Sequence, residues 1–587
     1  MERVTRLPAA PHMLQEHDDE RLLLGFADGL AICDEGRLDV TVHGAIDAAA
    51  RGPDGLLYCT RGPQILRFDM DQGGDSQDVT ATFAGRPSGR HQVVCTADGE
   101  IWVEGGAARL RPNGGSAPTP ACPLAGAAPV PWATDIYGNR WSLVDAVGGR
   151  QVLVLPANTP EAWQLAWLPV GRWDFLVADS VGYVWVAGAD GWRVFCPAKA
   201  AAGWQTPGGV APAGAVTAVA TSPDGRVMAA FDTGDLLELD TNAATELLLR
   251  PLATIPGAGR ALHVDRRGAI WVATDEGLYR QPATADAWQQ TWTQQRGRLP
   301  GGGNHDVFAA ACLGKLYIAG GWAGAWGLPP SAHVCDELFA FDPASQYWEV
   351  ASRMHIPRRY NGIAELDSRV WVVGGETRTA GREGEGQALY LVDIYDPASH
   401  CWHAGPALND VRTDPFVVSC NGRIYAIGGA AHNSGPKLST VESIGSGESA
   451  WRFETPLPEP TRQGHACVLE GVIYCASIDG VFAFDVASGC WDDDLPQPGS
   501  IGQGPLAAAY RGEVWLIGGF GDRRCRCYNP DTRTWRLGPD LPTEQAWGAA
   551  IVYEGQLFVT GGAHASPMHD AVVFDDRSYR LRQDGDR

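Results

Sequence analysis

The stretch Val370-Trp371-Val372-Val373-Gly374-Gly375 decides the fold, because a short apolar strand that ends in two glycines recurs along the second half of the chain. Five clear copies and one degenerate copy occupy residues 316–321, 370–375, 424–429, 472–477, 514–519 and 557–562. The second small residue recurs every 42 to 54 residues. A period of this length without helical patterning predicts the blades of a β-propeller.

A turn and a spaced aromatic residue follow several of these copies. Examples are Phe341-Asp342-Pro343 with Trp348, Tyr395-Asp396-Pro397 with Trp402, and Tyr528-Asn529-Pro530 with Trp535. Proline fixes φ in such a turn, and an aromatic side chain fills the space between neighbouring sheets. With these motifs, residues from about 300 to 580 resemble a six-bladed kelch propeller. The glycines are expected to let neighbouring backbones approach one another near the central axis.

The first half of the chain carries a different repeat, in which an Asp-x-x-Gly turn leads into a buried strand. The clearest copy is 265–280, and the turn glycines are Gly55, Gly99, Gly138, Gly182, Gly225 and Gly268, separated by 39 to 44 residues. A weaker seventh copy lies at 19–30. The pattern favours seven blades, with six as the alternative. Asp135, Asp179 and Asp265 are expected to form turns.

This repeat resembles the propeller of sensor proteins of the two-component regulator type. The chain is therefore predicted to be all-β, with two tandem β-propellers of about seven and then six blades. Their expected ranges are 1–290 and 291–587, with a boundary between Arg280 and Gly301. The linker carries Trp292, which can belong to an outer strand of the second propeller, whereas Trp288 can equally complete the first propeller.

Composition excludes several classes of protein. With 73 glycines, 40 prolines and 22 tryptophans, the 587 residues suit short strands and tight turns, and not disorder or long helical bundles. The formal net charge of −23 disfavours nucleic acid and anionic lipid as partners. No signal-peptide pattern or long apolar stretch is present, which predicts a cytoplasmic protein without a membrane partner. The 14 cysteines contain no C-x-x-C motif, so metal content and cofactors remain unknown.

The residues before each inner strand and after each glycine pair are predicted to surround the mouth of the second propeller. The candidate ligand-binding residues are Asn304, Arg358, Arg359, Tyr360, Arg412, Asp414, Arg462, Gln503, Gln545, Trp547, Trp322, Glu376, His432 and His564. Trp326, Asn433, Asp479 and His569 are expected at the same rim.

Two interpretations stand for the arginines of this set. In kelch proteins, arginines at such positions often bind acidic groups, and the resemblance implies this role for Arg358, Arg412 and Arg462. Alternatively, these arginines only hold the carbonyl oxygens of nearby loops.

His305, Asp306 and His465 are the candidate catalytic residues, because a histidine pKa near neutrality suits a general base. Together with His564 they can also be read as a metal site, or as residues that only satisfy a neighbouring blade. The leading prediction is a binding protein that recognises a protein or an acidic small molecule at the kelch mouth. The alternative is an isomerase, lyase or metal-dependent tailoring enzyme that uses the same funnel.

Overall fold

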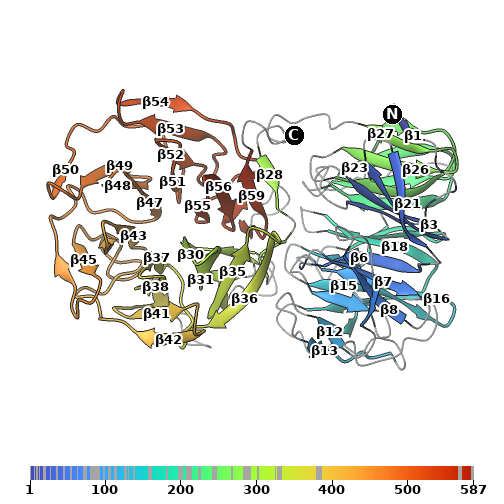
Figure 1. Ribbon diagram of the computed structural model, residues 1–587, viewed down its shortest axis with the longest axis horizontal. Coiled ribbons are helices and arrows are strands. Elements are labelled where there is room, and N and C mark those ends of the chain that lie inside the picture. The colour runs from blue at the N-terminus through green and yellow to red at the C-terminus, as the bar shows by residue number, and fades with distance from the viewer. Residues whose placement is uncertain are drawn as a thin grey trace. The chain divides into compact units, whose positions relative to one another are not determined.

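The computed structural model describes most of the chain, and every regular element in the described part is a β-strand (Figure 1). It covers residues 2–295 with gaps at 6, 8, 10, 12, 17–20, 27, 35–36, 44–45, 53, 55, 62–63, 70–75, 80–92, 97–99, 104–107, 111–115, 125–128, 130, 136–138, 157–161, 180–182, 196–202, 207–213, 223–225, 241–247, 266–268 and 282–291, and residues 297–582 with gaps at 301–302, 324, 327–332, 378–385 and 566–571. Within these ranges, no helix is long and apolar enough to cross a membrane.

The chain forms two compact units, the first comprising Met1–Gln289 and the second beginning at Gln290. In its described part the first unit contains seven antiparallel sheets, which we number 1a to 7a. In order they are β2 (Met13–Glu16), β3 (Leu22–Phe26), β4 (Gly29–Asp34), β5 (Arg37–His43); β6 (Ala48–Arg51), β7 (Leu57–Arg61), β8 (Gln64–Phe68), β9 (Ser76–Asp78); β10 (Val93–Cys95), β11 (Ile101–Val103), β12 (Ala108–Leu110), β13 (Ser116–Pro118); β14 (Ala133–Thr134), β15 (Arg140–Ala146), β16 (Gly149–Leu155), β17 (Gln164–Leu165); β18 (Trp173–Ala178), β19 (Val184–Gly188), β20 (Gly191–Phe195); β21 (Val216–Thr221), β22 (Val227–Phe231), β23 (Asp235–Asp240), β24 (Leu248–Thr254); and β25 (Gly259–Val264), β26 (Ile270–Thr274), β27 (Leu278–Gln281) with β1 (Glu2–Thr5).

The last sheet of the first unit is completed by the start of the chain. Strand β1 pairs antiparallel with β27, with Glu2 opposite Arg280. Strand β2 of the first sheet also contacts β25 of the last sheet. The two ends of the first unit are therefore joined both within a sheet and between sheets.

The repeated aspartates of the first unit form turns, which confirms their predicted role. Asp179 accepts hydrogen bonds from the backbone nitrogen of Tyr183 at 2.9 Å and from the indole nitrogen of Trp185 at 2.8 Å. Asp265 makes the equivalent pair with Ala269 and Trp271, both at 2.9 Å. Asp135 likewise accepts from the backbone of Asn139 and the indole of Trp141. Each carboxylate thus accepts one hydrogen bond from the backbone of its turn and one from the tryptophan of the following strand.

The second unit contains six four-stranded antiparallel sheets in its described part, numbered 1 to 6 (Figure 1). In order they are β30 (Ala309–Cys312), β31 (Lys315–Ala319), β35 (Glu337–Asp342), β36 (Tyr347–Arg353); β37 (Gly362–Leu366), β38 (Arg369–Val373), β41 (Val392–Asp396), β42 (Cys401–Ala404); β43 (Phe416–Cys420), β44 (Arg423–Ile427), β45 (Val441–Gly445), β46 (Arg452–Phe453); β47 (Gly464–Leu469), β48 (Val472–Ser477), β49 (Gly480–Asp485), β50 (Cys490–Trp491); β51 (Leu506–Tyr510), β52 (Glu513–Ile517), β53 (Cys525–Asn529), β54 (Thr534–Leu537); and β55 (Ala549–Tyr553), β56 (Gln556–Thr560), β59 (Ser578–Leu581), β28 (Trp292–Gln294). A short strand, β29 (Asn304–His305), precedes the first inner strand. Other short strands lie in the loops after the glycine pairs: β32 (Trp322–Ala323), β33 (Ala325–Trp326), β34 (His333–Val334), β39 (Glu376–Thr377), β40 (Gln387–Ala388), β57 (Ala563–Ala565) and β58 (Val572–Phe574).

The first strand of each sheet is its inner strand. Each inner strand contacts the inner strand of the next sheet, and β30 of sheet 1 also contacts β55 of sheet 6. In Figure 1 these inner strands lie around the middle of the unit, and β36, β42, β50 and β54 lie at its periphery. The sequence-based expectation for the linker is confirmed, because Trp292 in β28 pairs with Leu581 in β59. Trp288, the alternative, lies outside the described residues.

The glycine pairs lie where neighbouring sheets meet, which confirms the predicted close approach of neighbouring backbones. Gly374 and Gly375 have φ of +64° and +96°. The Gly375 nitrogen donates to the carbonyl oxygen of Arg412 in the next sheet at 2.9 Å. A Cβ on Gly374 would lie 2.7 Å from the same oxygen, which leaves no room for a side chain. The equivalent bonds run from Gly321 to Arg358, Gly429 to Thr461, Gly519 to Gln545 and Gly562 to Asn304 at 2.8 to 2.9 Å.

Sheet 4 has no glycine pair at the end of its second strand. Here β48 continues through Ser477 and turns directly into β49, with Ser477 opposite Gly480. The Ser477 hydroxyl is hydrogen-bonded to the hydroxyl of Thr461 at 2.7 Å. The degenerate repeat in the sequence therefore corresponds to a tighter hairpin, which has no backbone excursion that requires two glycines.

We predict that Gly374→Ala destabilises the second unit more than Gly422→Ala. Gly422 has a similar φ of +73° but open space where a Cβ would lie. Both variants incur the left-handed backbone cost of about 1–2 kcal/mol, and Gly374→Ala adds the displacement of a backbone oxygen. Urea denaturation of the full chain, with deuterium exchange of peptides from β38 and β43, measures the difference. Equal losses in the two variants would contradict the close-approach argument.

Candidate functional site

Three consecutive residues before each inner strand of the second unit occupy three recurring positions. We call them the anchor, the bridge and the collar residue. The anchor carbonyl accepts the glycine hydrogen bond from the preceding sheet, as Arg358 and Arg412 do. The bridge residue pairs with the segment after the glycines of its own sheet, as Arg359 does with Glu376. The collar residues are Asp306, Tyr360, Asp414, Gln463, Gly504 and Trp547.

All six collar residues have left-handed backbones. Their φ values lie between +55° and +60°, although only one of the six is glycine. Backbone hydrogen bonds link some neighbours: Asp414 donates to Tyr360 at 2.9 Å, and Trp547 donates to Gly504 at 2.8 Å. A Cβ on Gly504 would lie 2.4 Å from the Trp547 ring, so the glycine makes room for that indole. The collar thus combines one repeated backbone conformation with five different residue types.

Two of the arginines predicted to bind ligand have internal partners. The Arg412 guanidinium is fully buried, pairs with Glu442 at 2.5 Å and donates to the carbonyl oxygen of Gly428 at 2.9 Å. Arg358, also fully buried, is ion-paired with Asp393 and donates to the Gly374 carbonyl. Burial lowers the pKa of both guanidinium groups, and the paired carboxylates offset part of that effect. This geometry agrees with the alternative interpretation, in which the two arginine side chains donate hydrogen bonds to carbonyl oxygens of nearby loops.

The bridge arginines are less alike. Arg359 is buried, pairs with Glu376 at 2.5 Å and lies over the Trp322 ring, with 3.9 Å from the guanidinium carbon to the ring centre. Arg462 is half-buried and donates to the carbonyl oxygen of Asn433. Among the predicted arginine triad, Arg462 alone retains exposed surface.

Acidic groups lie at the collar. Asp306 and Asp414 are both buried. The pKa of Asp414 is raised well above its usual range, first by burial and then by the negative charge of Asp306. Burial, followed by the charges of Asp306 and Asp414, also raises the pKa of Tyr360. The positive charges of Arg462 and Arg359 act on Asp414 in the opposite direction, so the collar holds acidic and basic groups together.

The candidate catalytic residues occupy two separate environments. His305 lies 2.8 Å from Asp306, measured from Nδ1 to Oδ1, and its ring contacts Phe574 with 4.1 Å between ring centres. His465 instead stacks on Phe308, with 5.1 Å between ring centres. No hydrogen bond or ring contact joins the two histidines in the described part of the chain. The same residues contain no cluster of three or more metal-ligating side chains.

The remaining candidates are spread over the same end of the second unit. Asn304 is buried, and its amide donates to the Gly320 carbonyl at 2.6 Å. Gln545 is fully buried, whereas Gln503 is exposed. His432 and His564 are half-buried, and exposed Asp479 pairs with Lys437 at 2.6 Å. The side chain of Trp326 and the whole of His569 lie outside the described structure.

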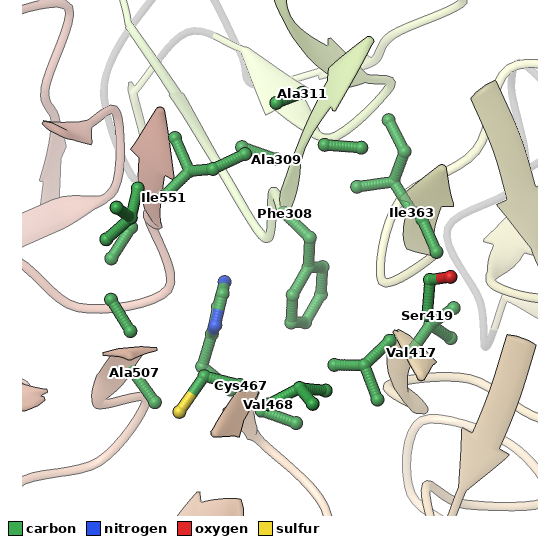
Figure 2. Close-up of a pocket in the computed structure, with 18 of the residues that line it drawn as sticks. Phe308, Ala309, Ala311, Ile363, Val417, Ser419, Cys467, Val468, Ala507 and Ile551 are labelled. Atoms are coloured by element: carbon green, nitrogen blue, oxygen red, sulfur yellow. The ribbon is translucent and has the colours of Figure 1, made fainter. Parts of the chain in front are cut away.

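A cavity of about 350 Å³ lies among the six inner strands, and we call it the central cavity. Figure 2 shows Phe308 pointing into it from the sheet 1 side, between Ile363, Val417 and Ile551 of other sheets. Since β30 and β47 are not neighbours, the stacked Phe308 and His465 meet across the cavity. These two residues follow the collar residues Asp306 and Gln463 by two positions, so the stack lies between the collar and the rest of the cavity.

The sequence interpretation did not include Phe308 or the cavity wall. Alanine runs at 309–311 and 507–509 provide a signal, because alanine is depleted in strands unless space is limited. The positive φ of the collar residues has no such signal, since Asp306, Tyr360 and Trp547 share no side-chain property.

We predict that Arg412→Ala destabilises the second unit by about 3–5 kcal/mol, because it leaves Glu442 buried without its cation. The double variant Arg412→Met with Glu442→Gln removes both charges and is expected to lose less. As a matched control, Arg452→Ala breaks an exposed pair with Glu454 and costs about 1 kcal/mol or less. Urea denaturation of the three variants gives the comparison. A cost for Arg412→Ala no larger than the control would disprove the structural role.

His465 is predicted to reduce stability in acid. Burial lowers its pKa from 6.5 to about 4, so the unfolded chain takes up a proton at a higher pH than the folded chain. The full stability is present above pH 6.5 and falls as the pH drops toward 4. His465→Phe removes this contribution, which is on the order of 3 kcal/mol at pH 4. His403→Phe, at an exposed position in β42, is the control, and unchanged pH dependence in His465→Phe would refute the prediction.

Comparisons with known proteins agree with the repeat in the second unit. A family model of the Kelch motif matches residues 357–409, from just before the anchor Arg358 to five residues after the last strand of sheet 2. Kelch-like protein 25 of Xenopus tropicalis is 28% identical over 248 residues, which cover 40% of this chain and 41% of that protein. The human Kelch-like protein 25 gives the same values. Alpha-scruin of Limulus polyphemus is 25% identical over 238 residues, or 39% of this chain and 21% of the scruin.

The chain thus spans about two fifths of the length of the Kelch-like relatives that it matches, and less of the scruin. The matched motif includes the glycine pair, the anchor arginine and the Asp-Pro turn of sheet 2. These matches and the repeated sheets lead to one conclusion: the chain contains a kelch-repeat domain.

Proposed function

We propose that this chain is a double β-propeller binding protein whose kelch-type unit recognises a protein partner. The proposal assigns seven blades to the first unit and six to the second, each forming a closed ring. The pairing of β1 with β27 and of β28 with β59 supports closure of the two units. The repeated Asp-to-tryptophan hydrogen bonds support a two-component-regulator-type propeller in the first unit. The expected ranges remain 1–290 and 291–587, and the location remains the cytoplasm.

The binding surface in this proposal is the collar face, which is the end of the second unit where the collar residues and the loops after the glycine pairs lie. The observation that carries the proposal is exposed apolar surface on this face. Tyr390, Val411 and Ile478 are 52%, 39% and 46% exposed. Two of them lie on joined segments, because the Arg412 nitrogen next to Val411 donates to the Leu389 carbonyl next to Tyr390 at 3.2 Å. Aromatic and aliphatic side chains in such positions commonly anchor protein interfaces.

Charge favours a neutral or basic partner surface over an acidic one. The net charge of −23 steers positively charged molecules toward the chain. Arg358 and Arg412 are already paired with carboxylates, and Asp306 and Asp414 lie at the collar. A protein that brings apolar side chains with a basic rim therefore fits the collar face better than an acidic ligand.

An enzymatic role has less support from the described residues. Catalysis by the predicted group needs His305, Asp306 and His465 around one substrate atom. His305 and Asp306 are adjacent, but His465 stacks on Phe308 inside the central cavity. Protein recognition therefore uses the geometry as it stands, whereas the enzyme would need these groups brought together.

A pair of triple variants tests the proposal. Tyr390→Ala, Val411→Asp and Ile478→Asp together alter the collar face, and we expect at least a tenfold loss of affinity for the cellular partner. Leu313→Asp, Phe453→Asp and Leu537→Asp alter residues that are 59%, 56% and 70% exposed and lie in the turn between β30 and β31 and on the outer strands β46 and β54. This control is expected to bind normally. Partners are identified by quantitative affinity capture with the full chain, and the affinities of purified partner and variants are then measured by calorimetry.

The comparison distinguishes the binding surface from general effects of charge. Loss of binding in both triples, with both proteins folded, would place recognition elsewhere. Retention of binding in the collar-face triple would equally refute the proposal.

A further inference from the structure

We propose that the central cavity of the second unit binds a slender uncharged molecule whose hydroxyl group forms hydrogen bonds with His465. This site differs from the collar face, and its existence does not depend on recognition of a protein there. It rests on three observations: the space inside the inner strands, the unpartnered imidazole that lines it, and the position of charge along its wall.

The walls of the central cavity suit an apolar chain. All six inner strands contribute to the lining, largely with small or aliphatic side chains such as Ala309, Val417, Ala507 and Ala550. The volume of about 350 Å³ is in the range of pockets that hold small molecules. Branched residues such as Ile363 and Ile551 narrow the space from two sides (Figure 2). The shape therefore favours a thin molecule over a globular one.

His465 supplies an unused hydrogen-bonding group at this wall. Its residue is 6% exposed, and neither ring nitrogen has a hydrogen-bond partner of normal geometry among the described residues. Backbone groups of Ala466 and Ala507 lie near the ring and offset part of the burial effect that lowers its pKa to about 4. The imidazole is therefore neutral at pH 7, with one N–H donor and one acceptor nitrogen. A bound hydroxyl group would supply the hydrogen bond of normal geometry that the buried ring nitrogens lack.

The charge pattern selects against acids. Glu365 also lines the cavity, where a carboxylate ligand would be repelled. A neutral imidazole offers such a carboxylate no compensating positive charge. The stack of Phe308 on His465 lies on the collar side of the cavity. A slender ligand that enters from the Glu365 side would therefore reach His465 with the polar group at its leading end. The ligand must carry no negative charge and must form a hydrogen bond with His465. An alcohol meets both requirements, because its uncharged hydroxyl group can donate or accept a hydrogen bond.

The test uses 1-hexanol and hexanoate as probe molecules with the full chain. Saturation-transfer NMR titrations give the affinity of each at pH 7. We expect measurable binding of 1-hexanol and at least tenfold weaker binding of hexanoate. His465→Phe keeps the stacked ring but removes both nitrogens, and it is expected to weaken 1-hexanol about fivefold to tenfold, the loss of one hydrogen bond of about 1 kcal/mol. His403→Phe, on an outer strand, should bind 1-hexanol normally.

A second variant covers the case in which His465→Phe does not fold. Ala509→Leu fills part of the cavity without altering His465 and should abolish 1-hexanol binding. Absence of 1-hexanol binding to the wild-type chain would overturn the proposal, as would equal binding to the wild type, His465→Phe and Ala509→Leu. A crystal structure of the soaked chain with only ordered water beside His465 would also overturn it. The alcohol in the central cavity would support it.

Discussion

The structure of the second unit depends on one hydrogen bond, from the second glycine of a pair to the anchor carbonyl of the next sheet. It recurs at five of the six junctions between sheets, with lengths of 2.8 to 2.9 Å. The bond requires a left-handed backbone at the glycines. It also requires close approach of two backbones, because the first glycine of the pair lies against the same anchor oxygen. Only glycine meets both conditions without strain. The positions of the glycine pairs in the sequence therefore indicate where neighbouring sheets meet.

The arginine side chains of two anchor residues also form hydrogen bonds and ion pairs within the unit. Arg412 reaches two backbone oxygens and Glu442, and Arg358 pairs with Asp393. A guanidinium can serve carbonyl and carboxylate groups together through its planar fork, whereas an ammonium acts as a single point charge. The composition follows this preference, with 43 arginines and 3 lysines among the 46 basic residues. Arg358 and Arg412 are thus engaged in contacts within the unit, whereas Arg462 keeps exposed surface.

The sequence predicts the strands and junctions well because their constraints are local and repeated. Residues only a few positions away explain three of these features: the pair Gly374 and Gly375, the Asp342 turn and the Asp179 turn. The site was less predictable, because its decisive contacts join residues in different sheets. Nothing near Arg412 in the sequence indicates that it pairs with Glu442, which lies in the third strand after it. The stack of Phe308 on His465 joins sheets 1 and 4, and the left-handed collar backbone is independent of residue type.

Departures from the repeat carry the strongest functional argument. At the position of Phe308, the other sheets have Gly362, Phe416, His465, Leu506 and Ala549. Phe416 and Leu506 are fully buried and extend the apolar core between sheets. Phe308 and His465 instead meet across the central cavity, and only the histidine brings polar atoms there without satisfying them. A repeat optimised for packing alone has no reason to place a neutral imidazole at this position when leucine and phenylalanine serve its equivalents. The cost of keeping His465 is therefore best explained by a molecule that uses it.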